Sequence, residues 1–150
     1  MTQEEQYMAQ ALTLAEEAGQ AGDIPVGCVV VRDGVVIGTG CNQREAQGDA
    51  TAHAELQAIR AACAALGSWH LEDCDLYVTL EPCPMCAGAI INARIRRVWY
   101  GAANPKAGCC GSVIALFQES FNHHPQVYGG VLAEPCGRVL RRFFHRLSEK

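Results

Sequence analysis

The spacing of apolar side chains predicts that helices and strands alternate along the first half of the chain. Apolar residues recur at helical spacing over residues 3–18, and a second helix, rich in Ala and Leu, is expected over 52–66. Between them, residues 26–40 form two β-branched runs on either side of Asp33-Gly34, a dipeptide favoured in two-residue type I′ turns. We therefore expect a helix, a β-hairpin and another helix, in this order.

The second half of the chain continues this alternation. Short apolar runs predict strands over residues 75–80, 96–102 and 126–132, and the segment 82–93 between the first two is predicted to be helical. A last helix with aromatic and basic side chains is expected over 134–150. The segments richest in turn-forming residues are expected to be loops: 42–49 and 107–111.

This order of elements predicts an α/β protein with a mixed five-stranded sheet and helices on both faces, a three-layer α/β/α arrangement. The 150 residues have the size of one domain, and no linker or internal repeat divides them, so we expect a single domain over 1–150. The strand-to-helix junctions before His53 and before Cys83 are expected at one edge of the sheet, where ligands of open α/β sheets bind.

Composition narrows the class of protein. Hydrophobic residues make up 49% of the chain and charged residues 19%, which is typical of a globular protein in water. No apolar run approaches membrane-spanning length, and the acidic, polar start MTQEEQYMAQ is no signal peptide. We therefore expect a cytoplasmic protein that has no membrane partner.

Charge is distributed unevenly along the chain. Residues 1–93 carry 3 basic and 13 acidic side chains, whereas residues 94–150 carry 9 basic and 3 acidic ones. The overall net charge of −4 argues against indiscriminate binding of nucleic acid. The basic second part is compatible with a face that meets a polyanion and equally with solvated helix faces.

The cysteines point toward metal chemistry. Nine cysteines, an odd number, in a reducing compartment argue against a disulfide framework and favour metal ligands or buried thiols. Cys83 and Cys86 form a C-x-x-C motif, which is compatible with a redox pair, a structural metal site or half of a catalytic one. With Glu81 near the N-cap and Pro82 at the first helical position, both thiols are expected on one face of the first helical turn.

His53 and Glu55 favour the catalytic alternative. His53 and the two cysteines supply three zinc ligands of suitable softness, whereas a structural zinc site is normally closed by four. With Thr51 as the expected N-cap, His53 reaches the metal and Glu55 reaches the water bound to it. Such a site produces zinc-activated hydroxide, and Glu55 can shuttle protons as general base and then general acid. This is the chemistry of hydrolytic deamination.

The same residues carry a resemblance to known enzymes. His53-Ala54-Glu55 followed by Pro82-Cys83-Pro84-Met85-Cys86 matches the H-x-E…P-C-x-x-C signature of zinc nucleobase deaminases. Over its full length the chain resembles the bacterial tRNA-specific adenosine deaminases of the cytidine/deoxycytidylate deaminase superfamily. The segments that carry this narrower resemblance are DIPVGCVVV, TAHAEL, TLEPCPMCAGAI, IRRVWYGA, PKAGCCGS and HHPQVYGGVLAEPCGRVLRRFF.

The resemblance implies a cytidine deaminase-like fold and a hydrolase that converts adenosine to inosine at the wobble position of a tRNA anticodon, chiefly in an arginine tRNA. It also implies tRNA as the partner and a homodimer with one zinc ion per subunit. In this comparison His53, Cys83 and Cys86 bind zinc and Glu55 moves protons. The implied substrate-binding residues are Asn42, on the flipped base; Ile24, Pro25 and Val26, in the pocket wall; Asn104, beside the sugar; and Arg142, Phe143 and Phe144, near the RNA.

Some of these residues also have simpler interpretations. Asn42 fits a turn, and Phe143 and Phe144 fit the core-facing side of an amphipathic helix. Asn104 stands where the family usually has Asp, so a negative charge beside the polyanion is missing here. Cys109 and Cys110 fit a loop, and a fourth zinc ligand among them stays open.

Three other functions compete with the implied one. A zinc deaminase of a free base or nucleoside, of guanine or cytosine type, shares the same metal motif. A non-enzymatic zinc module needs four protein ligands and no essential Glu55. A redox protein needs an accessible thiol of low pKa and no metal.

Overall fold

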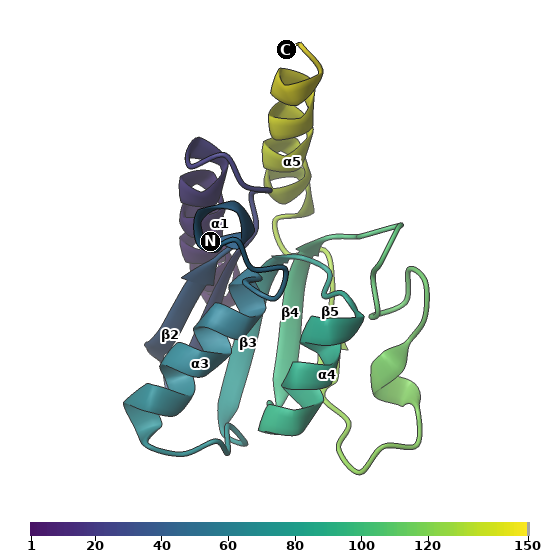
Figure 1. The fold of residues 1–150 in the computed structure, drawn as a ribbon. Helices are drawn as coiled ribbons and strands as arrows, with labels where there is room; N and C mark the ends of the chain where they lie inside the picture. Colours follow the sequence, from purple (N-terminus) through teal and green to yellow (C-terminus); the bar gives the residue numbers. More distant parts are fainter. Residues whose placement is uncertain (150) are drawn as a thin grey trace.

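A computed structural model describes residues 1–149 and contains one mixed five-stranded sheet with the strand order β2-β1-β3-β4-β5 (Figure 1). β1 is antiparallel to both β2 and β3, whereas β3, β4 and β5 are parallel to one another. The mixed sheet predicted from the sequence is therefore confirmed. The strands span Gly27–Arg32 (β1), Val35–Cys41 (β2), Cys74–Leu80 (β3), Arg97–Ala102 (β4) and Gln126–Tyr128 (β5).

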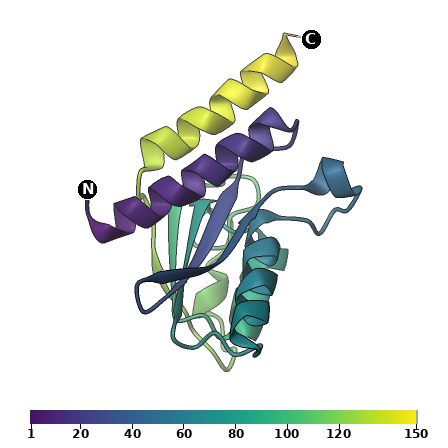
Figure 2. The same ribbon diagram turned by 90° about the vertical axis from the view of Figure 1, so that its left-hand side faces the viewer.

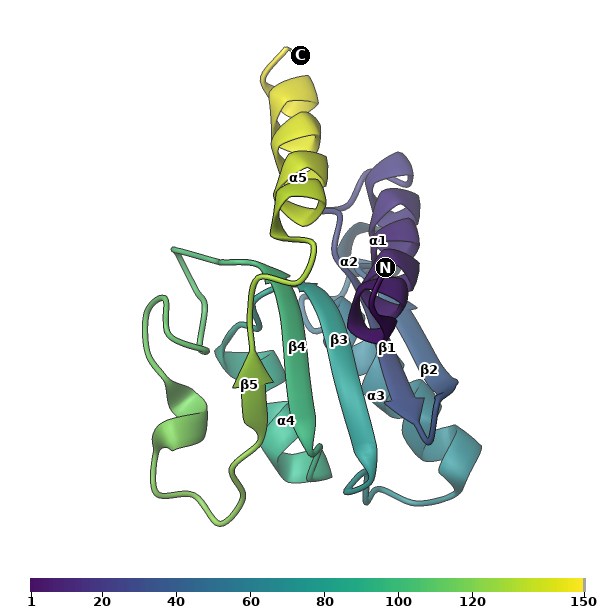
Figure 3. The same cartoon turned by 180° about the vertical axis from the view of Figure 1, so that it is seen from behind.

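Helices cover both faces of this sheet, as the order of elements predicts. Helices α3 and α4 lie on one face, and α1 and α5 run side by side on the other (Figures 2 and 3). Their bounds, with those of two short helices, are Gln3–Gln20 (α1), Arg44–Gln47 (α2), Ala54–Leu66 (α3), Pro84–Ala93 (α4), Leu116–Gln118 (the 3₁₀ helix η1) and Ala133–Ser148 (α5). Among residues 1–149, no helix is both long and apolar enough to span a membrane.

Two hydrophobic clusters hold the layers together because side chains alternate between the faces of a strand. In β1, Val30 packs with Leu76 in the cluster beneath α3 and α4, whereas its neighbour Val29 packs with Met8 of α1 and Tyr77 on the opposite face. All five side chains are at least 97% buried. The central strands are thus apolar on both faces, which explains their continuous hydrophobic runs.

The hairpin joins β1 to β2 through Asp33 and Gly34, which both have positive φ, at 50° and 77°, as a type I′ turn requires. The predicted loop over 42–49 contains the short helix α2. The last strand ends at Tyr128 and not at residue 132, because Gly130 and Leu132 have positive φ, at 85° and 52°, which an extended strand does not allow. Lys150, expected at the end of the last helix, lies outside the described residues.

Helix α3 packs directly onto the backbone of β2 at Gly40. A Cβ atom at this position would come within 2.7 Å of the amide nitrogen of Ala58 and of the Cβ of Gln57. The sheet therefore approaches α3 closely near the helical turn that carries His53 and Glu55.

Replacing Gly40 by alanine is expected to lower the free energy of unfolding by about 1–3 kcal/mol, the usual result of overpacking a close contact. Urea denaturation of wild type and Gly40→Ala measures this change. Gly88→Ala in α4 is the matched control, because a Cβ there meets no atom within 4 Å. Equal stability of Gly40→Ala and wild type would contradict the packing described here.

Candidate active site

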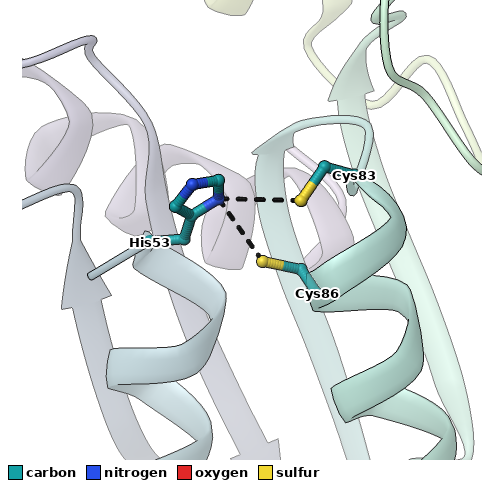
Figure 4. A group of neighbouring side chains, drawn as sticks. All are labelled: His53, Cys83 and Cys86. Carbon is teal, nitrogen blue, oxygen red and sulfur yellow. Dashed lines mark hydrogen bonds between the residues drawn. The ribbon is translucent and has the colours of Figure 1, made fainter. Parts of the chain in front are cut away.

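Three side chains with metal-binding atoms meet at the first residues of α3 and α4 (Figure 4). His53 is the N-cap of α3, and Cys83 is the N-cap of α4, with Cys86 in the first turn of the same helix. Both helices begin at the same edge of the sheet, where the sequence predicts the two strand-to-helix junctions. The structure thus brings together residues that are 30 and 33 positions apart.

Both helices begin later than the sequence predicts, for local reasons. Thr51 is not the N-cap of α3, because its amide and hydroxyl groups both donate to Asp49 Oδ1, at 2.8 and 2.7 Å. Glu81 is not near the N-cap of α4, and Pro82 is not its first residue. The residue before a proline avoids the helical region, so Pro84 keeps Cys83 extended, with ψ at 174°, and α4 begins at Pro84 itself.

The spacing of the three ligand atoms fits zinc. His53 Nδ1 lies 3.7 Å from Cys83 Sγ and 3.6 Å from Cys86 Sγ. Zinc bonds of about 2.1 Å to nitrogen and about 2.3 Å to sulfur place tetrahedral ligands about 3.6 Å apart. One imidazole and two sulfurs also form a donor set that zinc prefers. A single ion can therefore contact all three side chains without rearrangement of the two helices.

The environment of Cys83 favours its thiolate form. A hydrogen bond from the Cys86 thiol, assisted by His53, lowers the pKa of Cys83 to about 4 although the side chain is half-buried. Burial raises the pKa values of thiols elsewhere in the sheet and loops, among them Cys28, Cys74 and Cys110. At neutral pH, protons therefore do not compete with a metal ion for Cys83.

Iodoacetamide at pH 6 is expected to alkylate Cys83 selectively in the metal-free protein, because only a thiolate attacks the reagent. Peptide mass spectrometry after a short exposure measures the modified fraction at each cysteine. Zinc-loaded protein is the control and should be protected at Cys83. Equal alkylation of Cys83 and Cys63, a partly exposed thiol of raised pKa, would contradict this account.

Glu55 lies in the first turn of α3, two residues after His53. Its side chain is 4% exposed, and burial raises its pKa to about 7. A carboxyl group with a pKa near the ambient pH can both accept and donate a proton, which is the requirement for general acid–base catalysis.

A cavity of about 250 Å³ opens beside the three ligand residues. His53, Cys83 and Glu55 line it together with four of the other predicted site residues: Ile24, Val26, Asn42 and Asn104. The sequence analysis did not select four further lining residues: Arg44, Leu80, Glu81 and Ala107. The cavity therefore combines the candidate metal centre, a buried acid and a partly apolar wall.

Asn42 joins two sides of this cavity. Its side-chain Nδ2 donates to the carbonyl of Ile24 at 3.0 Å, and its Oδ1 accepts from the amide of Ala54 at 2.9 Å. The side chain is 94% buried, so its orientation is fixed. One N–H and one lone pair of the amide group remain for a ligand.

Four predicted substrate-binding residues lie elsewhere. Pro25, Arg142 and Phe143 line a separate groove of about 290 Å³ between α1 and α5, which also contains Arg138 and Arg146. Pro25 takes part in this groove because Ile24 and Val26, its neighbours on either side, face the metal cavity. Phe144 is 49% exposed on α5 and is not part of either space.

Two buried carboxylates that sequence reasoning did not assign to the site hold the cavity in shape. Asp23 accepts hydrogen bonds from the amides of Ile24 and Glu45 and from Arg44 Nε, at 2.8, 3.0 and 3.2 Å. Glu81 accepts hydrogen bonds from the segment between β4 and η1. A carboxylate at the end of a continuous apolar run, as in DLYVTLE, is the sequence signal that could have indicated Glu81.

Comparison with known proteins agrees with this geometry. Residues 1–102 match the family described as the cytidine and deoxycytidylate deaminase zinc-binding region. The chain belongs to this deaminase family. Its cofactor is accordingly zinc, and His53, Cys83 and Cys86 form the one cluster of ligand-type side chains found between residues 1 and 149. Cys109 and Cys110 lie outside this cluster.

Relatives of this deaminase match nearly its whole length. The tRNA-specific adenosine deaminase of Bacillus subtilis (strain 168) is 48% identical over 151 residues, covering 100% of this chain and 94% of the relative. A solved structure from work on A-to-I editing by tRNA:A34 deaminases superposes with a TM-score of 0.86 at 46% identity, over 90% of this chain and 99% of the other. The guanine deaminase of Nitrosomonas europaea shares the fold, with a TM-score of 0.75 at 23% identity, over 93% of this chain and 83% of the other.

Proposed function

We propose that this protein is a zinc-dependent hydrolase that deaminates adenosine to inosine at the wobble position of a tRNA anticodon, with an arginine tRNA as its substrate. The observation that carries the proposal is the buried Glu55 beside the three-ligand zinc site, in a chain similar from end to end to tRNA adenosine deaminases. We assign residues 1–150 to one deaminase domain.

The chemistry assigns a distinct role to each residue of the cavity. His53, Cys83 and Cys86 hold the zinc ion, which when bound makes water a nucleophile at neutral pH. Glu55 takes a proton from the attacking water and passes it to the purine ring. It then takes a second proton from the new hydroxyl group and passes it to the amino group, which leaves as ammonia. A C6–O bond replaces the C6–N bond, and Glu55 returns to its initial state.

Asn42 is proposed to orient the flipped adenine. Its fixed amide group has one free donor and one free acceptor position, which suits the polar edge of a base. Ile24 and Val26 would supply apolar wall for the ring, and Asn104, which also lines the cavity, is proposed to lie beside the sugar. Pro25 supports this wall from behind, since it packs toward the groove on the opposite side.

The last helix is proposed to contact the anticodon stem-loop. Arg142 and Phe143 line the groove between α1 and α5, where Arg138 and Arg146 add positive charge. Phe144 is half-exposed on the same helix and can stack on an unpaired base. Phosphate contacts from these arginines would also explain why the basic residues concentrate after residue 93.

We further propose that the protein is a cytoplasmic homodimer. Val113, Ile114 and Phe121 are 55%, 46% and 48% exposed in the segment between β4 and β5 that follows the cavity wall. Exposed apolar side chains grouped in one segment are suited to packing against a second subunit. Analytical ultracentrifugation of Ile114→Asp should show dissociation, whereas Val35→Asp, at an exposed position on β2, should leave the dimer intact.

A comparison of substrate classes tests the proposed function. The value of kcat/KM for an anticodon stem-loop with adenosine at the wobble position should exceed that for free adenosine, cytidine and guanine by several orders of magnitude. Efficient deamination of guanine or cytidine, with none of the stem-loop, would replace the proposal by a deaminase of free bases or nucleosides.

A further inference from the structure

Glu81 occupies a position that the proposed mechanism leaves unexplained. It follows β3 directly, precedes Pro82 and the zinc ligand Cys83, and lines the cavity, yet only 1% of its surface is exposed. A buried carboxylate is costly unless several donors surround it. The groups that donate hydrogen bonds to Glu81 therefore indicate which part of the structure it stabilises.

All four side-chain hydrogen bonds of Glu81 come from one segment, residues 104–112. Oε1 accepts from the amide of Asn104 at 3.1 Å and from the hydroxyl of Ser112. Oε2 accepts from the amides of Cys110 and Ser112, at 2.8 and 3.1 Å. One carboxylate thus fixes both ends of the segment and joins it to the end of β3.

This segment is a wall of the substrate cavity. Asn104 and Ala107 line the cavity, and the amide of Ala107 donates to Asn104 Oδ1 at 3.2 Å, so the two residues move together. The amide of Cys109 also donates to the carbonyl of Pro82 at 2.9 Å. Without the Glu81 side chain, three amides and one hydroxyl would lose their acceptor, and the bond from Cys109 to Pro82 would still join the wall to the residues that follow β3.

The hydrogen bonds of Glu81 do not involve the zinc ligands. His53 and Cys83 are placed by the starts of α3 and α4, where the first backbone bond of α4 runs from the Ala87 amide to the Cys83 carbonyl at 2.9 Å. Loss of Glu81 should therefore disturb the wall while the metal site persists.

We infer that Glu81 is a positioning residue that holds the 104–112 wall against the substrate nucleotide. The inference rests on the proposed function for the identity of that substrate. It assigns to Glu81 an effect on substrate binding, transmitted through Asn104 and Ala107, and no part in the proton transfers.

Gly108 offers a second way to disturb the same carboxylate. A Cβ atom at this position would collide with the carboxyl group of Glu81 and approach the carbonyl oxygen of Asn104 to 2.6 Å. Gly108→Ala should therefore displace the wall from the opposite side and reproduce the effect of a change at Glu81. Gly88→Ala, which introduces a Cβ into open space in α4, is the matched control.

The test compares Glu81→Gln, Gly108→Ala and Gly88→Ala for zinc content, kcat and KM on the anticodon stem-loop. Glutamine has nearly the same shape as glutamate, but its NH2 group is a donor. It would face backbone N–H groups that are donors as well, so their hydrogen bonds would be lost. We expect KM to rise about 30–100-fold in the first two variants, the scale of two or more typical hydrogen bonds, with kcat changed less than about 3-fold because the wall binds the ground state and the transition state alike. Zinc content should stay at the wild-type level, and Gly88→Ala should match wild type. Unchanged KM in Glu81→Gln, or a KM effect that accompanies loss of zinc, would overturn the inference.

If Glu81→Gln does not fold, Ser112→Ala tests the inference in its place. This change removes one donor and leaves the other three, so the wall is released only in part and KM should rise about 3–10-fold, the value of one typical hydrogen bond. An unchanged KM in Ser112→Ala would then count against Glu81 as a positioning residue.

Amide resonances separate this inference from the proposed function. In wild type, the amide protons of Asn104, Cys110 and Ser112 should resonate downfield because they bond to a carboxylate, and they should move upfield in Glu81→Gln or, if that variant does not fold, in Gly108→Ala. This readout needs no substrate. Inactivity of the wild type on the stem-loop would reject the function, whereas unshifted resonances would reject the role of Glu81.

Discussion

Replacing Glu55 by glutamine is expected to lower kcat on the anticodon stem-loop by about 10²–10⁴-fold, the usual contribution of a general acid–base group. Glutamine has nearly the same shape but cannot accept and return a proton. Because Glu55 is 4% exposed and lies in the cavity with the metal ligands, bulk water cannot easily replace it. Single-turnover kinetics with saturating enzyme measure the loss.

Two controls, the zinc content and a matched variant, show whether this loss comes from the missing proton shuttle. Glu55→Gln should bind one zinc ion per subunit, since its carboxylate is not among the three ligands. Glu17→Gln, at an exposed position on α1, should keep the full rate. Retention of wild-type kcat in Glu55→Gln would show that another group moves the protons.

Replacing Cys86 by alanine is expected to abolish both zinc binding and activity. Cys86 is fully buried, and the two remaining ligands leave a tetrahedral ion half-coordinated. Without zinc, the pKa of water rises from about 7 toward about 15.7, so the rate should fall by more than about 10⁴-fold. Metal analysis after dialysis and the inosine yield measure the two losses.

Cys109→Ala separates loss of a ligand from loss of a buried thiol. Cys109 is 1% exposed but lies outside the cluster of metal ligands. Its replacement should lower stability modestly and leave zinc content and kcat unchanged. Equal loss of zinc in Cys109→Ala and Cys86→Ala would require a different ligand set.

Local patterns in the sequence predict much of this fold because the responsible interactions are short-range. The hairpin follows from Asp33-Gly34, and the mixed sheet follows from the alternation of apolar runs and helices. The zinc ligands are predictable for another reason, since only a few residue types bind zinc and their spacing is characteristic. The structure then places the metal-binding atoms of His53, Cys83 and Cys86 within 4.8 Å of one another.

Long-range hydrogen bonds account for what the sequence does not indicate. Glu81 bonds to residues 23 to 31 positions away, and Asp23 bonds to Arg44 and Glu45, so neither role leaves a periodic signal. The starts of α3 and α4 differ by two residues from the prediction, because prolines and an Asp49–Thr51 turn take precedence over the expected caps. Pro25 alternates with Ile24 and Val26 and so faces the groove between α1 and α5, whereas the resemblance implies that all three line one pocket.

The most direct test of the central claim is to map inosine in a tRNA anticodon stem-loop after incubation with the zinc-loaded protein. The substrate should carry adenosine at the wobble position and at a second position of the loop, and mass spectrometry of the digested RNA should locate each deamination. The account predicts inosine at the wobble position alone, with none formed by Glu55→Gln in the same time. Zinc-loaded, folded protein that leaves the wobble adenosine unchanged would contradict it.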